Sequence, residues 1–303
     1  MTAAFRAFLL VALSLTRTLA AQEVAPKPEP LKYDLQYKFK TGEEIRYDVV
    51  DLVSIETTIA GNSQTAQAVS KSVKLWRVSD GKAGSEITFE HSVESVDMRN
   101  LMSGRQEVRY NSQTDKEAPP GYEDAAKAVG VTLATVTIDP RGAVLKRIEQ
   151  KTGNAGTGGQ IVVPLPTQAI PIGHVWTVPH EITVALDGDA VKKVKARQRF
   201  SLDGVTPDGM AQISVEMQIL TPISDPKVQA QLIQRLTKGT ITFDLKAGRI
   251  VSHELSLDER VLAFHGPDSS MHYQRKFTEK LVPAAEKVAR KPEVKKEEPK
   301  KDL

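Results

Sequence analysis

Apolar and polar residues alternate with a period of two along much of this chain, and this alternation constrains its fold more than any other feature. Ile87, Phe89 and Val93 alternate with polar neighbours in one segment, and Ile213 and Val215 do so in another. Successive side chains of a β-strand point to opposite faces, so the pattern predicts strands with one buried and one solvated face. Such strands are typical of antiparallel sheets.

Asp-Gly dipeptides punctuate the alternating segments. This dipeptide favours the tight turns of β-hairpins, because both residues tolerate the backbone conformations that those turns need. We therefore expect hairpin turns at four places, namely Asp80-Gly81, Asp187-Gly188, Asp203-Gly204 and Asp208-Gly209.

Two stretches of the chain resemble two later ones. Residues 86–90 (EITFE) align with 212–216 (QISVE), and residues 135–139 (TVTID) align with 240–244 (TITFD). We interpret the matches as an internal duplication. The predicted fold is a β-rich α+β fold of two similar curved antiparallel-sheet halves. Each half carries one helix against its concave face and is half-barrel-like.

One helix is expected in each half. In the second half Asp225 can cap a helix that Pro226 begins, and Gly239 would stop it. Val228, Leu232 and Leu236 would fall on one face of that helix. In the first half a shorter helix is predicted over residues 122–129.

The N-terminus has the three parts of a secretory signal peptide. Arg6 precedes an apolar stretch over residues 7–13, and the small residues Ala20 and Ala21 suit a cleavage site. The apolar stretch is shorter than the roughly 20 residues that span a bilayer. We expect export to the periplasm or the extracellular space, with an uncleaved N-terminal anchor as the alternative.

Composition shifts divide the chain into five predicted regions. Proline-rich sequence favours an extended linker, and a Lys/Glu/Pro tract has too little apolar surface to fold. The regions are a signal peptide (1–21), a Pro-rich linker (22–31), a first β-rich half (32–158), a second β-rich half (159–283) and a disordered tail (284–303).

Charge and cysteine content exclude several classes of protein. The 41 Lys and Arg nearly balance the 38 Asp and Glu, giving a net charge of +3. A chain this close to neutral offers no electrostatic footprint for nucleic acid. It contains no cysteine, which removes disulfides, thiolate metal sites and cysteine nucleophiles. No segment of the predicted mature chain is long and apolar enough to be transmembrane.

Four histidines are candidate site residues. His91 and His253 lie on the apolar faces of their predicted strands, where we expect satisfied core histidines, with metal ligation as the alternative. His265 and His272 flank Gly266-Pro267-Asp268 and are interpreted as a solvated loop pair. No His-x-His or His-Glu-x-x-His spacing occurs.

Two Ser-x-x-Lys spacings and two aspartates have structural interpretations. Residues 79–82 form an expected turn, and residues 224–227 form an expected helix cap. The motifs that complete a serine-acylating site are absent. Asp139 and Asp244 each precede a glycine, so we expect them to cap turns rather than act as paired carboxylates.

Two further segments could have suggested anion binding. Residues 153–159 are glycine-rich but lack the Gly-Lys-Ser/Thr ending of a phosphate loop, so a flexible connection is expected. A basic row on one strand face is interpreted as a charged solvent face rather than an anion site. Its members are Lys193, Lys195, Arg197 and Arg199.

A short segment at the opening of the second half resembles a known family. Pro164-Leu165-Pro166 is followed, after an apolar spacer, by Gly173-His174-Val175-Trp176. This is similar to the Leu-Pro…Gly-x-x-Trp strand opening of an exported bacterial β-rich family of unknown function. The resemblance implies a β-rich envelope protein and brings no catalytic residues with it.

The sequence thus favours an exported cell-envelope protein that binds an apolar ligand or an envelope component without catalysis. We assign no catalytic, cofactor-binding or metal-ligating residue and no cofactor, and the sequence leaves the oligomeric state open. Two alternatives remain: an envelope hydrolase with an unrecognised site, and a purely structural envelope component. An open apolar groove would favour the binding hypothesis.

Overall fold

The computed structural model describes residues 30–82, 84–150, 161–186 and 190–283. Strand dominates these residues, and every strand ladder between them is antiparallel, as the alternation predicted. The elements are β1 (Lys32–Tyr33), β2 (Glu44–Ile59), β3 (Asn62–Gly81), β4 (Ile87–Met102), β5 (Val108–Asn111), α1 (Glu123–Ala128), β6 (Thr132–Ile138), β7 (Val144–Glu149), β8 (Ile170–Pro171), β9 (Val175–Ala185), β10 (Val191–Val205), β11 (Met210–Ile219), α2 (Pro226–Leu232), the 3₁₀ turn η1 (Ile233–Arg235), β12 (Lys238–Asp244), β13 (Arg249–Leu262) and β14 (Ser269–Leu281).

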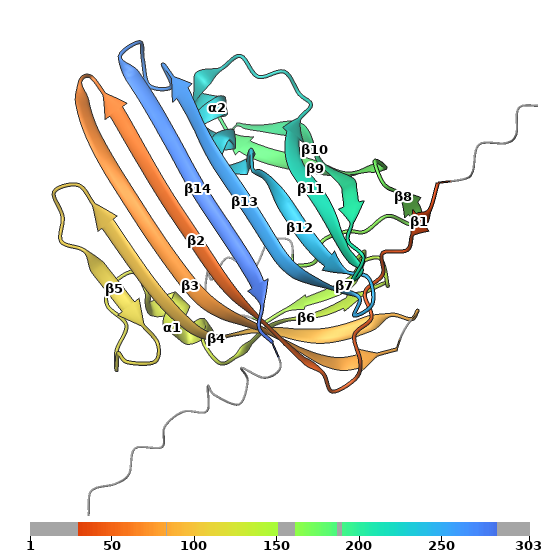
Figure 1. The fold of residues 1–303 in the computed structure, drawn as a ribbon. Coiled ribbons are helices and arrows are strands. Elements are labelled where there is room, and N and C mark those ends of the chain that lie inside the picture. The colour runs from red at the N-terminus through yellow and green to blue at the C-terminus, as the bar shows by residue number, and fades with distance from the viewer. Residues whose placement is uncertain (1–29, 83, 151–160, 187–189, 284–303) are drawn as a thin grey trace, which may run out of the picture. The chain divides into compact units, whose positions relative to one another are not determined.

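Twelve of these strands form one sheet (Figure 1). Its order is β7-β6-β4-β3-β2-β14-β13-β12-β11-β10-β9, and β5 pairs with the far end of β4. Neighbours are successive along the chain except at two places: β4 pairs with β6, which follows β5 in the chain, and the first long strand, β2, pairs with the last, β14. β1 and β8 form a separate two-stranded sheet.

The predicted pair of separate curved sheets is therefore not confirmed. Strands from both predicted halves lie in a single sheet, joined where all 13 residues of β14 pair with β2. Phe89 and Val215, which the repeat aligns, are both buried, but in one shared core. Two open half-sheets would have four exposed edges, and the β14–β2 ladder satisfies the backbone groups of two of them.

An N-terminal segment, residues 34–40, closes the main core. Leu35, Tyr37 and Phe39 alternate inward and are at most 1% exposed. The segment is held from two sides, by a 2.8 Å bond from Tyr37 N to Pro140 O and a 3.0 Å bond from Lys38 N to Gly248 O. Each buried aromatic ring contributes on the order of 2 kcal/mol, so this segment is part of the fold.

The Asp-Gly dipeptides that the structure describes occupy two kinds of position, a turn and the interior of a strand. Asp208-Gly209 lies in the β10–β11 turn, as predicted. Asp80-Gly81 and Asp203-Gly204 lie inside β3 and β10, where the strand register shifts, so those two turn predictions are wrong. Neither Gly81 nor Gly204 has the positive φ of a tight hairpin turn, so the dipeptide alone does not distinguish a turn from an irregularity within a strand. Asp187-Gly188 lies outside the described residues.

Both predicted helices are present. α1 occupies residues 123–128, with Tyr122 and Val129 as its caps. α2 begins at Pro226, and Asp225 caps it by accepting a 2.9 Å bond from Lys227 N. The predicted stop at Gly239 is wrong, because this residue lies within β12. A Cβ there would be 1.8 Å from Glu254 O, so the close approach of β13 requires glycine.

Candidate functional site

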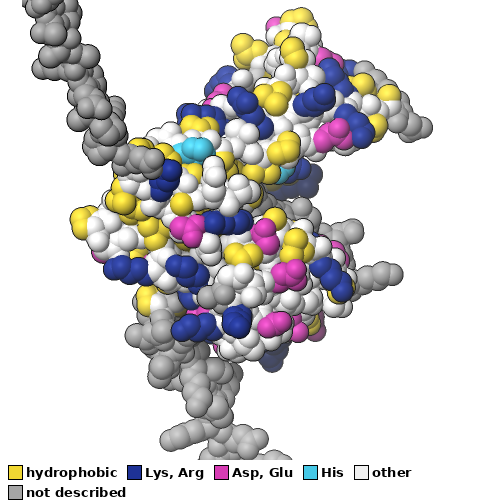
Figure 2. Space-filling view, turned by 90° about the vertical axis from the view of Figure 1, so that its right-hand side faces the viewer, with side chains coloured by type: hydrophobic (Ala, Val, Ile, Leu, Met, Phe, Trp, Pro, Cys, Tyr) yellow, Lys and Arg dark blue, Asp and Glu magenta, His cyan; other side chains and the backbone are white. Residues whose placement is uncertain are grey.

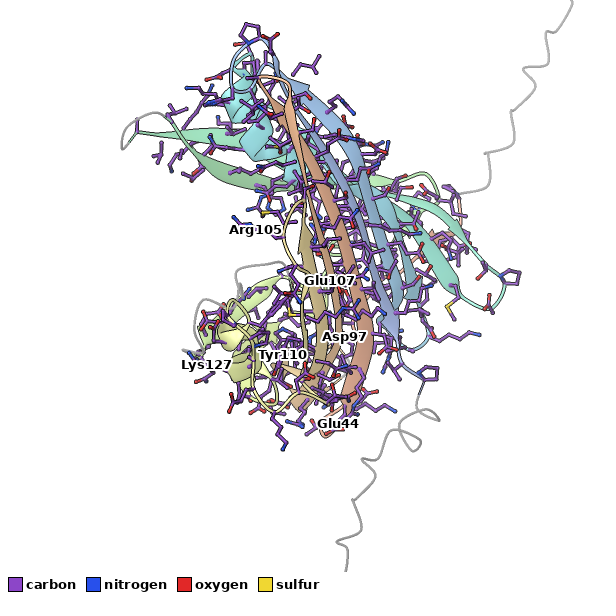
Figure 3. The ribbon with its side chains drawn as sticks, turned by 90° about the vertical axis from the view of Figure 1, so that its left-hand side faces the viewer. Glu44, Asp97, Arg105, Glu107, Tyr110 and Lys127 are labelled. Atoms are coloured by element: carbon purple, nitrogen blue, oxygen red, sulfur yellow. The ribbon has the colours of Figure 1, made fainter. Side chains whose placement is uncertain are left out.

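Both helices cover the same face of the long strands, here called the inner face and defined by Tyr47, Trp76 and Phe89. Figure 3 shows α1, near the label Lys127, and α2 on one side of these strands. The hairpin of β9 and β10 projects on that side as well, and Figure 2 shows the surface hollowed beneath it. Both helices pack on small apolar clusters separate from the main core: α1 on one, and α2 with η1 on two.

An apolar groove runs beside α2 and η1. It has a volume of about 420 Å³ and lies between these helices, the loop that follows β11 and the end of β13. Thr221, Gln229, Glu259 and Arg260 supply its polar lining. We call it the helix groove. Its apolar lining consists of Pro222 and six large side chains, namely Ile219, Ile223, Leu232, Ile233, Leu236 and Val261.

The helix groove exists because α2 and η1 divide their apolar contacts between two clusters. Leu232 packs with Val184 and Val194 from β9 and β10. The next residue, Ile233, packs instead with strands near the middle of the sheet. Side chains from both clusters line the groove, so it is the seam between them. Ligand sites in proteins have volumes of roughly 300–1,000 Å³ and mainly apolar walls, and this seam fits that description.

A buried ion pair lies on the inner face next to two aromatic residues of the main core, Tyr47 and Trp76. Lys74 pairs with Glu279 across β3, β2 and β14, and their side chains are 14% and 11% exposed. The Lys74 Nζ lies 4.7 Å from the ring centre of Tyr47 and 4.5 Å from that of Trp76. The pair compensates the charge of each partner in a site that water barely reaches.

His91 and His253 both lie on the inner face near this pair. Burial, together with the charges of Lys74 and Arg147, lowers the pKa of His91 to about 4. Burial also lowers the pKa of His253, against the opposing effect of Glu279. Both therefore stay neutral at pH 7.

The prediction of satisfied core histidines is only half right. Both rings are largely buried, but among the described residues His91 Nδ1 and His253 Nε2 have no hydrogen-bond partner. Within the described residues, no three His, Asp or Glu side chains lie close enough together to hold a metal ion.

The predicted turn and cap residues occupy the predicted positions. Asp139 Oδ1 accepts bonds from Arg141 N (2.9 Å) and Ala143 N (2.8 Å), and Asp244 Oδ1 accepts bonds from Lys246 N (2.8 Å) and Ala247 N (2.9 Å). These aspartates cap separate turns and do not form a carboxylate pair. Residues 224–227 cap α2, as expected.

The other candidates give mixed outcomes. Ser79 lies in β3 rather than in a turn, and its hydroxyl donates to Thr88 O. The basic row of β10 is a charged face, with Lys193 paired to Glu181 at 2.7 Å and 68% exposed. The glycine-rich stretch 153–159 lies outside the described residues.

The sequence did not predict a contact between His272 and Asp258. His272 lies in β14 rather than in a loop, and its Nε2 is 2.6 Å from Asp258 Oδ1 on β13. Hydrogen bonding from His272 and then Gln274 lowers the pKa of Asp258. Asp258 and Gln274 border a shallow concavity of about 580 Å³ on the outer face, and His272 contacts the first of them. Only the register of β13 against β14 brings them together, and no sequence motif encodes it.

Comparison with known proteins leaves the family open. No protein-family model matches the chain, and no curated protein matches it. One similar solved structure is described as "Lipid-protein interactions in lipovitellin" and is 9% identical, with a TM-score of 0.43. The match covers 81% of this chain and 26% of the other, so this chain spans about a quarter of that protein's length.

Proposed function

We propose that this chain is an exported cell-envelope protein that binds an apolar or amphiphilic ligand without catalysis, and that the helix groove is its binding site. One observation carries the proposal. The seam between the two helix clusters is open, has a volume of about 420 Å³, and is walled mainly by aliphatic side chains. An apolar concavity of this size, with a few polar groups at its edge, is suited to an aliphatic ligand.

The chemistry of the lining limits the ligand and its affinity. Each buried methylene contributes about 0.8 kcal/mol, so a ten-carbon chain gains at most about 8 kcal/mol. The cost of immobilising the ligand reduces this gain, so a dissociation constant of about 1 µM is the tight limit for such a chain. Gln229 and Arg260 are positioned to contact a polar end group.

A matched pair of tryptophan substitutions tests the site. Leu236→Trp places an indole in the helix groove, whereas Gln234→Trp places it on the exposed part of η1, outside the groove. Titration with a fluorescent fatty acid should show saturable binding to wild type and to Gln234→Trp. For Leu236→Trp we expect affinity lower by about tenfold or more, the effect of losing roughly two buried methylenes.

Thermal unfolding of both variants provides the control. Both should remain folded, so that a loss of binding reports the groove. Equal affinity in the two variants, or no saturable binding by wild type, would contradict the proposal.

A further inference from the structure

Three hairpin tips at one end of the long strands carry exposed aliphatic side chains. Ile59 ends β2 and is 38% exposed, and Leu262 ends β13 and is 64% exposed. Leu101 and Met102 end β4 and are 39% and 40% exposed. We call these the hairpin tips. Large apolar side chains at the ends of hairpins are unexpected, since solvent-facing turns favour Gly, Asn, Asp and Ser.

The hairpin tips are neighbours in the sheet. Ser269 pairs with Ile59 and accepts a 2.7 Å bond from Ala263 N, which joins the β13–β14 tip to the β2–β3 tip. Ser103 N donates a 2.8 Å bond to Thr65 O, which joins the end of β4 to β3. Figure 1 shows the β2–β3 and β13–β14 turns at the same end of the sheet.

The backbone adds a second observation. Ala60 (φ 48°) and Ala263 (φ 58°) are the two non-glycine residues with positive φ in the described part of the chain, and each lies in one of these turns. The left-handed conformation costs about 1 kcal/mol for alanine, and Gly or Asn would avoid most of that cost. Both turns therefore contain alanine where the backbone conformation favours Gly or Asn. This choice points to an apolar environment around the turns.

We infer that the hairpin tips dock on a lipid bilayer surface, an inference that rests on the proposed ligand-binding function. The tips adjoin the helix groove along the chain, because Val261 of β13 lines the groove and Leu262, whose side chain points to the opposite face, is the next residue. Docking at this end would place the groove beside the apolar source of its ligand.

The form and charge of the tips fit a bilayer better than a protein partner. A stable protein interface covers roughly 800 Å² per partner as a continuous surface, whereas an interfacial membrane contact needs apolar side chains to reach only about 5–10 Å into the headgroup boundary. Arg105 follows β4, Glu56 lies near the end of β2, and Asp268 lies in the β13–β14 turn, so the tips carry charges of both signs. Apolar insertion should therefore dominate, with little dependence on anionic lipid.

Vesicle flotation tests the inference. Full-length protein should float with phosphatidylcholine vesicles, and added phosphatidylglycerol should change this little. Met102→Asp and Leu262→Asp should each lower the partition coefficient about tenfold, because each removes a buried apolar side chain from the interface. Leu145→Asp is the matched control: Leu145 is 53% exposed on edge strand β7, away from the tips. Its partitioning should equal that of wild type.

The groove variant separates this inference from the proposed function. Leu236→Trp should float like wild type although its affinity for fatty acid is lower, and Leu262→Asp should bind soluble fatty acid normally although it floats less. The docking inference fails if wild type does not float, or if the tip variants float as well as wild type. Neither result affects the fatty-acid titration.

Discussion

Individual residues on the inner face show how the sheet accommodates polar groups near its core. Lys74 and Glu279 compensate each other, and the rings of Tyr47 and Trp76 add a cation–π contact to the lysine. His91 lies opposite Trp76 on the next strand. Removing one partner of a buried pair costs several kcal/mol, because the other charge stays buried. The histidine avoids that cost by remaining neutral.

His91 therefore makes the stability of the protein depend on pH. Its pKa is about 4 in the folded chain and 6.5 ordinarily. As pH falls from 6.5 to 4, His91 takes up a proton in the unfolded chain but stays largely neutral in the folded chain. The free energy of unfolding therefore decreases through that pH range. Urea unfolding should show wild type losing about 3 kcal/mol more than His91→Met between pH 7 and pH 4. Equal losses in the two proteins would contradict the assignment, since His253 titrates in both.

Among the structural elements, α2 has the most direct bearing on the proposed site. It has only seven residues, too few to be stable alone. Its stability comes from the Asp225 cap, from Pro226 at its start, and from the buried Val228 and Leu232. The helix groove exists only while this short helix is in place, so the cap supports the site without touching a ligand.

Substitutions at Asp225 test that dependence. Asp225→Ala removes the acceptor for Lys227 N and should lower the free energy of unfolding by about 1 kcal/mol. Asp225→Asn retains an acceptor at the same position and should stay within a few tenths of a kcal/mol of wild type. Chemical denaturation measures both. An asparagine variant as unstable as the alanine variant would show that the cap is not the cause.

Local signals predicted these elements well. The alternation identified β4, β9 and β11, and the Asp-Pro start identified α2, because each pattern depends only on neighbouring residues. The ends of elements were harder. In the sequence Gly239 follows a helical pattern and predicts a helix stop, but the close approach of Glu254 in the folded chain makes it a strand glycine. Asp80 and Asp203 show the same ambiguity between turn and bulge.

At the scale of the whole molecule, the long-range ladder between β2 and β14 decides the architecture. These strands lie more than 200 residues apart in the chain and pair along the whole of β14. Alternation specifies that a strand has a buried face but does not specify its partner. The sequence therefore predicted a β-rich antiparallel fold correctly and could not predict one continuous sheet. The helix groove could not be predicted from the sequence either, because its walls come from segments that meet only in the folded chain.

Photo-crosslinking tests the central claim, that the helix groove binds an apolar ligand, most directly. A fatty acid with a diazirine at its methyl end would be bound, photolysed and mapped by peptide mass spectrometry. We expect labels in peptides that contain residues 219–236 and Val261, competition by unlabelled fatty acid, and loss of labelling in Leu236→Trp. Labels concentrated on the outer face, or labelling that neither competitor nor Leu236→Trp reduces, would contradict the claim.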